Sequence, residues 1–236
     1  MISIFKKIFS HINYLFYIIP TIYINLKYLP LKQAVKLPIW VIKPHFYNLK
    51  GKIILDTTHI SCGMIKLGVL CALSYPDTGI RLNLQGGTIV FKGKCRIGSN
   101  SVIEVGKHGK LIFGNNIIAS TTLRIFCYKN IHIDDNNRFG WDVILMDTNF
   151  HPLKDLNTGQ KKCATKEIYI GKNNWFGSRT VCMPGTKTLN HCIFGLGAII
   201  NKNASLESYA VHIGTPCTPI SRNVYRDLND DRDEYQ

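Results

Sequence analysis

His151 is the residue in this chain whose type and setting best suit acid–base chemistry. It stands in the polar segment Asp147-Thr148-Asn149-Phe150-His151-Pro152-Leu153. An imidazole titrates near neutral pH, so it can take the proton of an attacking hydroxyl and return it to a leaving group. Pro152 biases His151 towards an extended backbone, which suits a side chain that projects from an edge. The chain has eight histidines, so a plain surface-loop histidine is the alternative.

Two carboxylates near His151 in sequence are expected to support it. Asp147 or Asp155 could orient the imidazole through its second nitrogen and stabilise the imidazolium. For Asp147, an Asx turn in the Asp-Thr-Asn corner is an equally good interpretation.

The elements that must position these residues repeat every six residues. The repeat has buried-type residues at Ile170, Phe176, Cys182, Thr188, Phe194 and Ile200, with Leu206 as a seventh position. Glycines follow three of them, at Gly171, Gly177 and Gly195. A helix would show a period of 3.6 and an ordinary strand a period of 2, whereas six-residue repeats indicate a parallel β-helix. We therefore predict an all-β chain that winds into a triangular coil.

The repeat also predicts which side chains stack. With three faces and about 18 residues in each coil, Ile170 should lie under Thr188, Phe176 under Phe194 and Cys182 under Ile200. Upstream, Phe113 and Ile133 are 20 positions apart. We expect one corner between them to bulge by two residues.

These patterns divide the chain into segments. Residues 1–50 form an N-terminal helical, membrane-proximal appendage, residues 51–222 the β-helix, and residues 223–236 an acidic, solvated tail. The repeat stops after His151, and residues 152–167 are polar. A long loop in a compact fold is usually functional, so this loop is expected to be a lid or an arm that bridges subunits.

Residues 1–30 are expected to form a helix at a membrane surface. The stretch between Lys7 and Lys27 has no formal charge and is long enough to span a bilayer. Its polar residues, Pro20 and the lack of a signal-type cleavage site argue against spanning or cleavage. Flanking lysines favour an interfacial helix, with packing against the β-helix or a second subunit as the alternative.

Charge and cysteine content bound the partners. The net charge is +14, and residues 1–55 hold eight lysines and no acid. Since no nucleic-acid-binding motif accompanies this charge, nucleic acid is not an expected partner. Anionic lipid or a polyphosphorylated cofactor fits better. Eight irregularly spaced cysteines indicate a reducing compartment, so the protein is expected in the cytoplasm. There it is expected to lie peripherally at the inner membrane.

The repeat and the histidine segment together resemble a known family. The pattern Ile170-Gly171, Trp175-Phe176-Gly177-Ser178, Met183-Pro184-Gly185, Phe194-Gly195-Leu196-Gly197-Ala198 and Gly214-Thr215-Pro216 is similar to the hexapeptide-repeat, left-handed β-helix acyltransferases. Within them it resembles the galactoside, maltose and xenobiotic acetyltransferase branch and its surface-polysaccharide relatives. The resemblance covers roughly residues 51–222. It implies a homotrimer, acetyl-CoA as donor substrate, no metal, and His151 as general base at a cleft between subunits.

The resemblance also implies donor and acceptor residues. The expected cofactor-binding residues are Trp175, Gly177, Ser178, Leu196, Asn201, Lys202 and Arg222. Leu196 replaces a usual alanine and Thr218 a basic residue, which are departures at the donor site. Trp141 and Asp142 are expected at the acceptor pocket, although Trp141 could equally pack at an interface.

The implied function is O-acetylation of a sugar hydroxyl in surface-polysaccharide biosynthesis. Phe126-Cys127-Tyr128 stand where galactoside-type enzymes carry Asn and Asp, so a simple galactoside is not expected. A lipid-linked or nucleotide-linked saccharide is expected instead. The alternatives are an N-acetyltransferase acting on an amino-sugar nucleotide, a non-catalytic β-helix scaffold, and a zinc hydratase using His132, His151 and His191.

Overall fold

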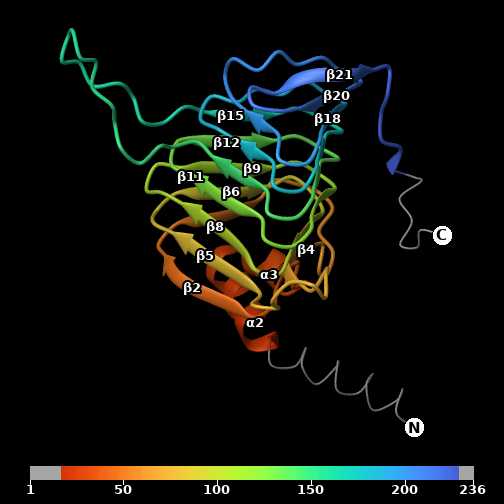
Figure 1. Ribbon diagram of the computed structural model, residues 1–236. Helices are drawn as coiled ribbons and strands as arrows, with labels where there is room; N and C mark the ends of the chain where they lie inside the picture. Colours follow the sequence, from red (N-terminus) through yellow and green to blue (C-terminus); the bar gives the residue numbers. More distant parts are fainter. Residues whose placement is uncertain (1–16, 229–236) are drawn as a thin grey trace.

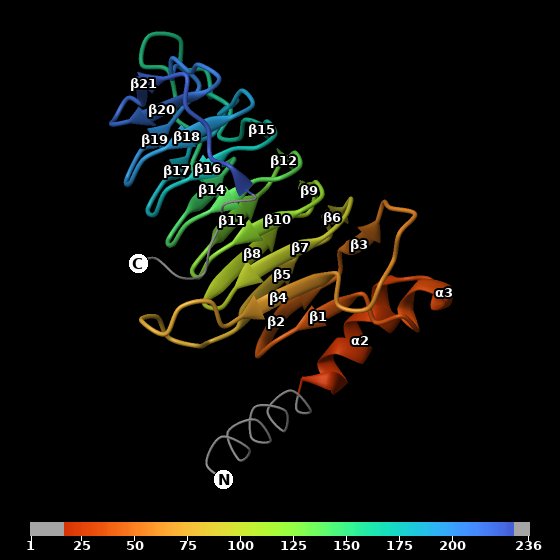
Figure 2. The ribbon, with the colours of Figure 1, turned by 90° about the vertical axis from the view of Figure 1, so that its right-hand side faces the viewer.

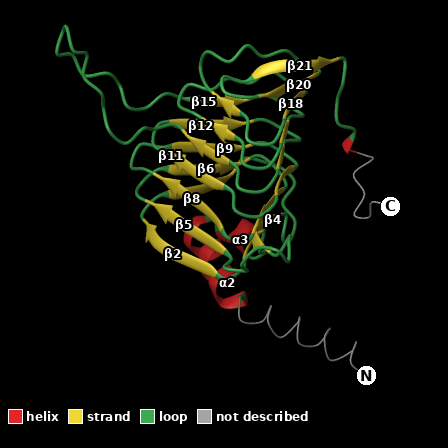
Figure 3. Cartoon of the chain, in the orientation of Figure 1, coloured by secondary structure: helices red, strands yellow, loops and turns green. Residues whose placement is uncertain are grey.

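The protein, described over residues 17–228 of a computed structural model, winds into a triangular prism with three parallel sheets as its sides (Figures 1 and 2). Figure 3 shows that strands and loops make up almost all of it. The nine-stranded sheet contains, in spatial order, β1 (Ile39–Val41), β4 (Ile65–Val69), β7 (Cys95–Gly98), β10 (Ile117–Ala119), β13 (Arg138–Phe139), β16 (Trp175–Phe176), β18 (Cys192–Phe194), β20 (Ala210–Ile213) and β21 (Thr218–Arg222).

The two other sheets complete each coil. The seven-stranded sheet runs β19 (Ile199–Ile200), β17 (Val181–Cys182), β14 (Ile144–Met146), β11 (Arg124–Cys127), β8 (Ser101–Val105), β5 (Ile80–Leu84) and β2 (Pro44–Leu49). The five-stranded sheet runs β15 (Ile168–Ile170), β12 (Asn130–Ile133), β9 (Lys110–Phe113), β6 (Thr88–Phe91) and β3 (Lys52–Leu55). Apart from β21, each strand pairs in parallel with the strand one coil away, so the predicted left-handed parallel β-helix is confirmed.

The predicted stacking is confirmed as well. Phe176 is in register with Phe194 and Cys182 with Ile200. The bridge between Tyr169 and Lys187 places Ile170 beside Thr188. Cys182, Cys192 and Cys217 are buried free thiols inside the prism, as expected for small apolar side chains.

An aromatic column fills the prism behind the nine-stranded sheet. The rings of Phe139, Phe176, Phe194 and His212 follow one another, with centroid distances of 4.7, 4.8 and 5.4 Å. All four side chains are buried. Because strands lie roughly 4.8 Å apart, one ring in each coil at the same register position produces this stack.

The expected two-residue bulge lies between β11 and β12. Phe113 and Ile133 are register partners 20 positions apart. Since Cys127 ends β11 and Asn130 begins β12, residues 128 and 129 form this corner. It is the corner nearest to the histidine segment.

The N-terminal helices close one end of the prism. Within α2 (Ile18–Tyr28), the amide nitrogen of Asn25 donates to the carbonyl oxygen of Ile39 at 2.7 Å, and Asn25 Oδ1 accepts the Ile39 N–H at 3.2 Å. A short helix, α3 (Leu31–Ala34), follows. The β-helix begins earlier than the expected boundary at residue 51, because β1 and β2 already pair with β4 and β5. Side chains of α2 form hydrogen bonds with backbone groups of β1. Because these bonds cover the free edge of β1, the β-helix can begin at this strand.

The outer face of α2 is apolar and exposed. Large side chains along this face are at least 39% exposed: Ile18, Ile19, Ile22, Tyr23 and Leu26. No helix among residues 17–228 is both long and apolar enough to cross a bilayer. The expected membrane-surface segment lies partly outside the described residues, since residues 1–16 are not described.

The C-terminal end is closed by an antiparallel strand. β21 pairs antiparallel with β20, whereas all other named strand pairs in the described part of the chain are parallel. The segment expected to be a solvated tail first crosses the nine-stranded sheet, where the Arg226 guanidinium lies 4.6 Å from the centroid of the Trp175 ring. Residues 229–236 lie outside the description.

Candidate active site

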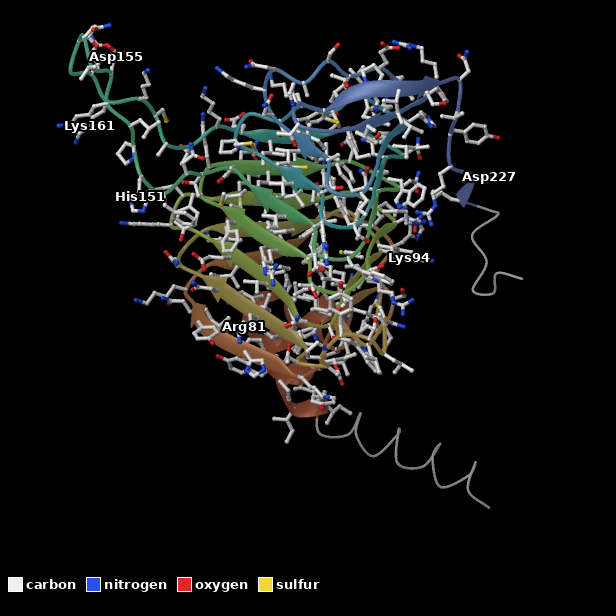
Figure 4. All side chains as sticks on the ribbon, in the orientation of Figure 1. Arg81, Lys94, His151, Asp155, Lys161 and Asp227 are labelled. Atoms are coloured by element: carbon white, nitrogen blue, oxygen red, sulfur yellow. The ribbon has the colours of Figure 1, made fainter. Side chains whose placement is uncertain are left out.

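His151 lies at the edge where the seven-stranded and five-stranded sheets meet. It follows β14 and precedes β15, and its side chain is exposed at the base of a projecting loop (Figure 4). Its backbone N–H donates to the carbonyl oxygen of Asn149 at 2.6 Å. The imidazole is therefore held outside the prism and is open to a substrate.

The loop after His151 is an arm with its own hydrogen bonds. Its two sides run antiparallel, with bridges between Thr148 and Thr165 and between Lys154 and Lys161. Near the far end, Leu156 is 98% exposed. Figure 1 shows the arm extending well away from the prism. Its shape suits contact with a second molecule better than closure over its own chain.

Asp147 does not face His151. Its carboxylate accepts backbone N–H groups from Tyr128, Lys129 and Asn130 at 2.7, 2.8 and 2.9 Å, and the residue is fully buried. Burial raises the pKa of Asp147, while the three N–H donors act to lower it. Asp147 therefore holds the bulged corner one coil away, which is neither the expected support of His151 nor the Asx turn considered as its alternative.

Asp155 lies at the outer end of the arm, away from His151 (Figure 4). Its carboxylate accepts the backbone N–H groups of Asn157 and Thr158, both at 3.1 Å, and lies 3.2 Å from Lys162 Nζ. These hydrogen bonds lower the pKa of Asp155. The structure thus brings neither expected carboxylate to the imidazole within one chain.

An aromatic cluster adjoins His151 on its N-terminal side. The Phe150 ring packs edge-on against Tyr128, at a centroid distance of 5.1 Å, and against Phe126, at 6.1 Å. Phe126 and Tyr128 belong to the segment where galactoside-type enzymes are expected to carry Asn and Asp. Aromatic faces and edges of this kind can pack on the apolar side of a sugar ring.

A polar cluster that sequence reasoning missed lies beside these rings. Glu104 accepts a hydrogen bond from the Tyr128 hydroxyl and another from Asn83 Nδ2 at 3.1 Å. Gln85 Nε2 lies 3.4 Å from the Tyr128 hydroxyl. Burial, followed by the hydrogen bond to Glu104, raises the pKa of Tyr128 to about 12. Three neighbouring strands of the seven-stranded sheet, β5, β8 and β11, supply these groups or end just before them, so no sequence window contains them together.

Trp141 and Asp142 lie at the other edge of the seven-stranded sheet, between β13 and β14. Asp142 Oδ2 accepts the Tyr75 hydroxyl at 2.7 Å, and the Tyr75 ring lies 5.7 Å from the Trp141 ring. The side chain of Trp141 is 43% exposed. Within one chain, these two residues and His151 occupy opposite edges of the same face.

Ser178 and Leu196 lie on that same far edge. Ser178 Oγ accepts the Trp141 N–H at 3.2 Å, and the Ser178 carbonyl accepts the Gly197 N–H at 2.9 Å. The corners at 141, 177–178 and 195–197 therefore stack in successive coils. An added Cβ at Gly197 would meet no heavy atom within 4 Å, and Leu196 is 72% exposed. This edge is therefore open at residues 196 and 197, where the donor is expected to bind.

Asn201 and Lys202 follow β19 and lie on the edge that carries His151, two coils further along. Lys166 joins them there, because side-chain atoms of Lys166 and Lys202 lie within 3.4 Å of an ideal Cβ at Gly185. Two lysines whose side chains start at one corner suit a phosphate. Lys166 was not predicted, since it stands in the loop rather than in the repeat.

Trp175 and Arg222 already have partners within the chain. Trp175 is covered by Arg226. Arg222 donates two hydrogen bonds to Glu207, from Nε at 2.7 Å and from Nη2 at 2.9 Å. Contact of Arg222 with a phosphate would therefore compete with an internal ion pair.

The three histidines of the zinc alternative lie at different places in this chain. His132 on β12 lies 3.1 Å from Asp134, whereas the His191 ring stacks on Tyr209 at 4.4 Å. Within residues 17–228 no group of three or more His, Cys, Asp or Glu side chains is arranged to hold a metal ion.

Comparison with known proteins agrees with the fold. No family model matches the chain. The galactoside O-acetyltransferase of Escherichia coli (strain K12) is 28% identical over 143 residues, which are 59% of this chain and 66% of that protein, just under two thirds of its length. The solved structure of the polySia-specific acetyltransferase NeuO covers 81% of this chain and 92% of its own, with a TM-score of 0.52 and 19% identity.

A second solved structure, the polysialic acid O-acetyltransferase OatWY, covers 82% of this chain and 90% of its own, with a TM-score of 0.43 and 17% identity. The expected resemblance to the hexapeptide-repeat acyltransferases is therefore confirmed, in sequence by the galactoside acetyltransferase and in fold by NeuO.

Proposed function

We propose that this chain is an acyltransferase that moves an acetyl group from acetyl-CoA to a sugar hydroxyl in surface-polysaccharide biosynthesis, with His151 as general base. The observation that carries the proposal is the position of His151. Its exposed imidazole stands beside a sugar-compatible surface of aromatic rings and hydrogen-bonding side chains. The similarity to a galactoside O-acetyltransferase supports the reaction class.

In this reaction His151 accepts the proton of the acceptor hydroxyl as its oxygen attacks the thioester carbonyl carbon. The resulting imidazolium then protonates the departing thiolate, so the base is regenerated in each cycle. A backbone N–H at the Ser178 corner can donate to the oxyanion that forms. Lys166 and Lys202 would bind phosphate groups of the donor.

The proposal requires a second subunit, and we propose a homotrimer. His151 and the expected donor site at Ser178 and Leu196 occupy opposite edges of the seven-stranded sheet. A rotationally symmetric assembly can place the His151 edge of one subunit against the Ser178 edge of the next. Exposed apolar side chains at both edges, including Leu153, Leu156 and Leu196, support such packing.

A direct test is the variant His151→Ala with saturating acetyl-CoA and a panel of saccharide acceptors, measured as CoA release. Loss of a general base should lower the rate by about 10²- to 10⁴-fold. The matched control is His59→Ala, an exposed histidine in a distant loop. Retained activity in His151→Ala would remove this residue from the mechanism.

Further measurements on the wild-type protein distinguish this function from its alternatives and test the oligomeric state. No binding of coenzyme A in calorimetry would favour the non-catalytic scaffold. Mass spectrometry of the product distinguishes O-acetylation from N-acetylation of an amino-sugar nucleotide. Sedimentation of the full chain measures the oligomeric state, and a monomer that is fully active would contradict the shared site.

We also propose that α2 holds the protein peripherally at the inner face of the cytoplasmic membrane. Its outer face presents Ile19, Ile22 and Leu26, and Lys27 stands next to this face. Flotation with anionic vesicles should be lost in Ile19→Glu combined with Leu26→Glu, and it should weaken with salt. Leu73→Glu, at a position that is 91% exposed in a distant loop, is the matched control. Unchanged flotation of the double variant would contradict the proposal.

A further inference from the structure

A basic groove on the five-stranded sheet has no role in the site described so far. It has a volume of about 750 Å³ and lies on the outer face of β3, β6 and β9. Its floor is aliphatic, because Ile54, Val90 and Ile112 are register partners on three adjacent strands. Val90 points outward yet is only 8% exposed, which shows how deep the groove is at its centre.

The rim of this groove is strongly positive. Lys52 and Lys110 flank Thr88 in register, and Lys92 follows β6. The corner that contains Lys107 and His108 adds to the lining. Asp56 is the one acidic residue of the groove lining. Among the described residues, none of these four lysines has a carboxylate within 4.0 Å. Four such ammonium groups around an apolar floor favour a ligand with several negative charges.

One corner of the groove, at Lys107 and His108, lies on the prism edge that carries His151. The corners along this edge contact one another in order. An ideal Cβ at Gly86 lies 3.5 Å from Lys107, and one at Gly106 lies 2.5 Å from the Tyr128 ring. Tyr128 in turn packs on Phe150, which precedes His151. Two coil steps separate the Lys107 corner from the start of the arm, roughly 10 Å along the prism axis.

The groove also lies on the acceptor side of His151. The residues expected to bind the donor, Ser178, Leu196 and Lys202, belong to coils after His151 in the sequence. The groove and the polar cluster at Glu104 and Tyr128 belong to coils before it. A ligand that extends from the imidazole into the groove therefore runs away from the donor.

We propose that this lysine groove binds an anionic group of the acceptor, a phosphate or a carboxylate attached to the saccharide whose hydroxyl faces His151. This inference rests on the proposed acetyltransferase function and names its substrate class. Lys52, Lys92, Lys107 and Lys110 contribute charge, while the aliphatic floor packs against the non-polar part of the ligand. The substrate is thus an acidic or phosphorylated saccharide rather than a neutral one.

Calorimetry on the full chain tests the groove with defined probes. One probe is UDP-N-acetylglucosamine, which carries a diphosphate. Another is an oligomer of galacturonic acid, which carries carboxylates, and a neutral maltose oligomer is the reference. We expect one anionic probe to bind and the neutral oligomer not to bind. Which anionic probe binds identifies the source of the charge, and salt should weaken its binding.

Two lysine variants assign the binding to the groove. Lys92→Gln combined with Lys110→Gln should lower the affinity for the anionic probe by at least about tenfold, because hydrogen bonds to charged groups are lost. Lys36→Gln combined with Lys66→Gln, two exposed lysines elsewhere, removes the same charge and should change the affinity less than about twofold. Equal weakening by both pairs, or by neither, overturns the proposal, as does failure of both anionic probes to bind the wild type.

Activity measurements keep this inference separate from the proposed function. In the groove variant, KM for an anionic acceptor should rise while KM for acetyl-CoA stays unchanged. His151→Ala should abolish transfer but leave binding of the anionic probe intact. Intact binding without any acetyl transfer by the wild type would refute the proposed function and, with it, the assignment of the groove to an acceptor.

Discussion

The Asp147 carboxylate accepts the backbone N–H of Lys129 at 2.8 Å, although 18 residues separate the two. This contact joins the start of the arm to the bulged corner one coil below. It also fixes Tyr128, whose N–H donates to the same carboxylate and whose ring packs on Phe150. The position of His151 therefore depends on a carboxylate that never contacts it.

Replacing this carboxylate should destabilise the fold. Asp147→Ala leaves three backbone donors without their acceptor, so the free energy of unfolding should fall by about 2–4 kcal/mol. Denaturant titration at fixed protein concentration measures the change. Asp155→Ala in the exposed arm is the control and should cost less than about 1 kcal/mol. Equal losses in the two variants would contradict the role assigned to Asp147.

The aromatic column gives a second prediction. Phe176 lies between Phe139 and Phe194 and is fully buried, so Phe176→Ala should lower the free energy of unfolding by about 3–5 kcal/mol. Phe150→Ala removes a ring that is 48% exposed and should cost clearly less. The same denaturant titration compares the two. A cost for Phe176→Ala below that of Phe150→Ala would argue against a packed interior at this coil.

Acid should weaken the C-terminal end through His212. Burial lowers the pKa of His212, and its Nε2 accepts the Glu207 N–H at 3.0 Å. The unfolded chain, with a histidine pKa near 6.5, therefore binds this proton before the folded chain does. Stability should fall as the pH drops from about 6.5 towards the lower folded pKa, and it should be insensitive to this group above that range.

The variant His212→Gln should show a flatter decline in thermal midpoint across this pH range. Burial also lowers the pKa of His132, so part of the decline should remain. His59→Gln, at an exposed loop position, serves as the comparison. An identical pH profile for His212→Gln and the wild type would show that His212 does not contribute.

Subunit mixing tests whether the site is shared. His151→Ala removes the base at one edge, and Leu196→Trp blocks the expected donor site at the other edge. Each homo-oligomer should be inactive. After joint refolding in equal amounts, about one quarter of the subunit contacts should combine an intact His151 with an intact donor site. Recovered acetyl transfer of this order is expected, whereas a site within one chain gives none.

The regular parts of the fold were predictable because the six-residue period is local. It correctly paired Phe176 with Phe194 and Cys182 with Ile200, since 18 residues make one coil there. The early coils are less regular: Ile53 pairs with Ile89 across 36 positions and Leu82 with Ile103 across 21. This irregularity hid the first strands, and the β-helix was expected to begin at residue 51 rather than at β1.

The surroundings of His151 could not be read from the sequence for a related reason. Glu104 on β8 meets Tyr128 because β8 pairs with β11, which ends just before Tyr128, and Lys52, Lys92 and Lys110 share a groove because their strands are neighbours. The numbers of residues between these positions vary from coil to coil. Only the folded chain brings them into register.

Helix α2 and strand β21 make the two ends of the prism unlike its middle. An uncovered final coil would offer free backbone groups to the first coil of another molecule, and parallel coils could then add end to end into a fibre. Here one end is blocked by a helix and the other by a strand of reversed direction. Both features oppose growth by stacking, which favours association through the sides of the prism.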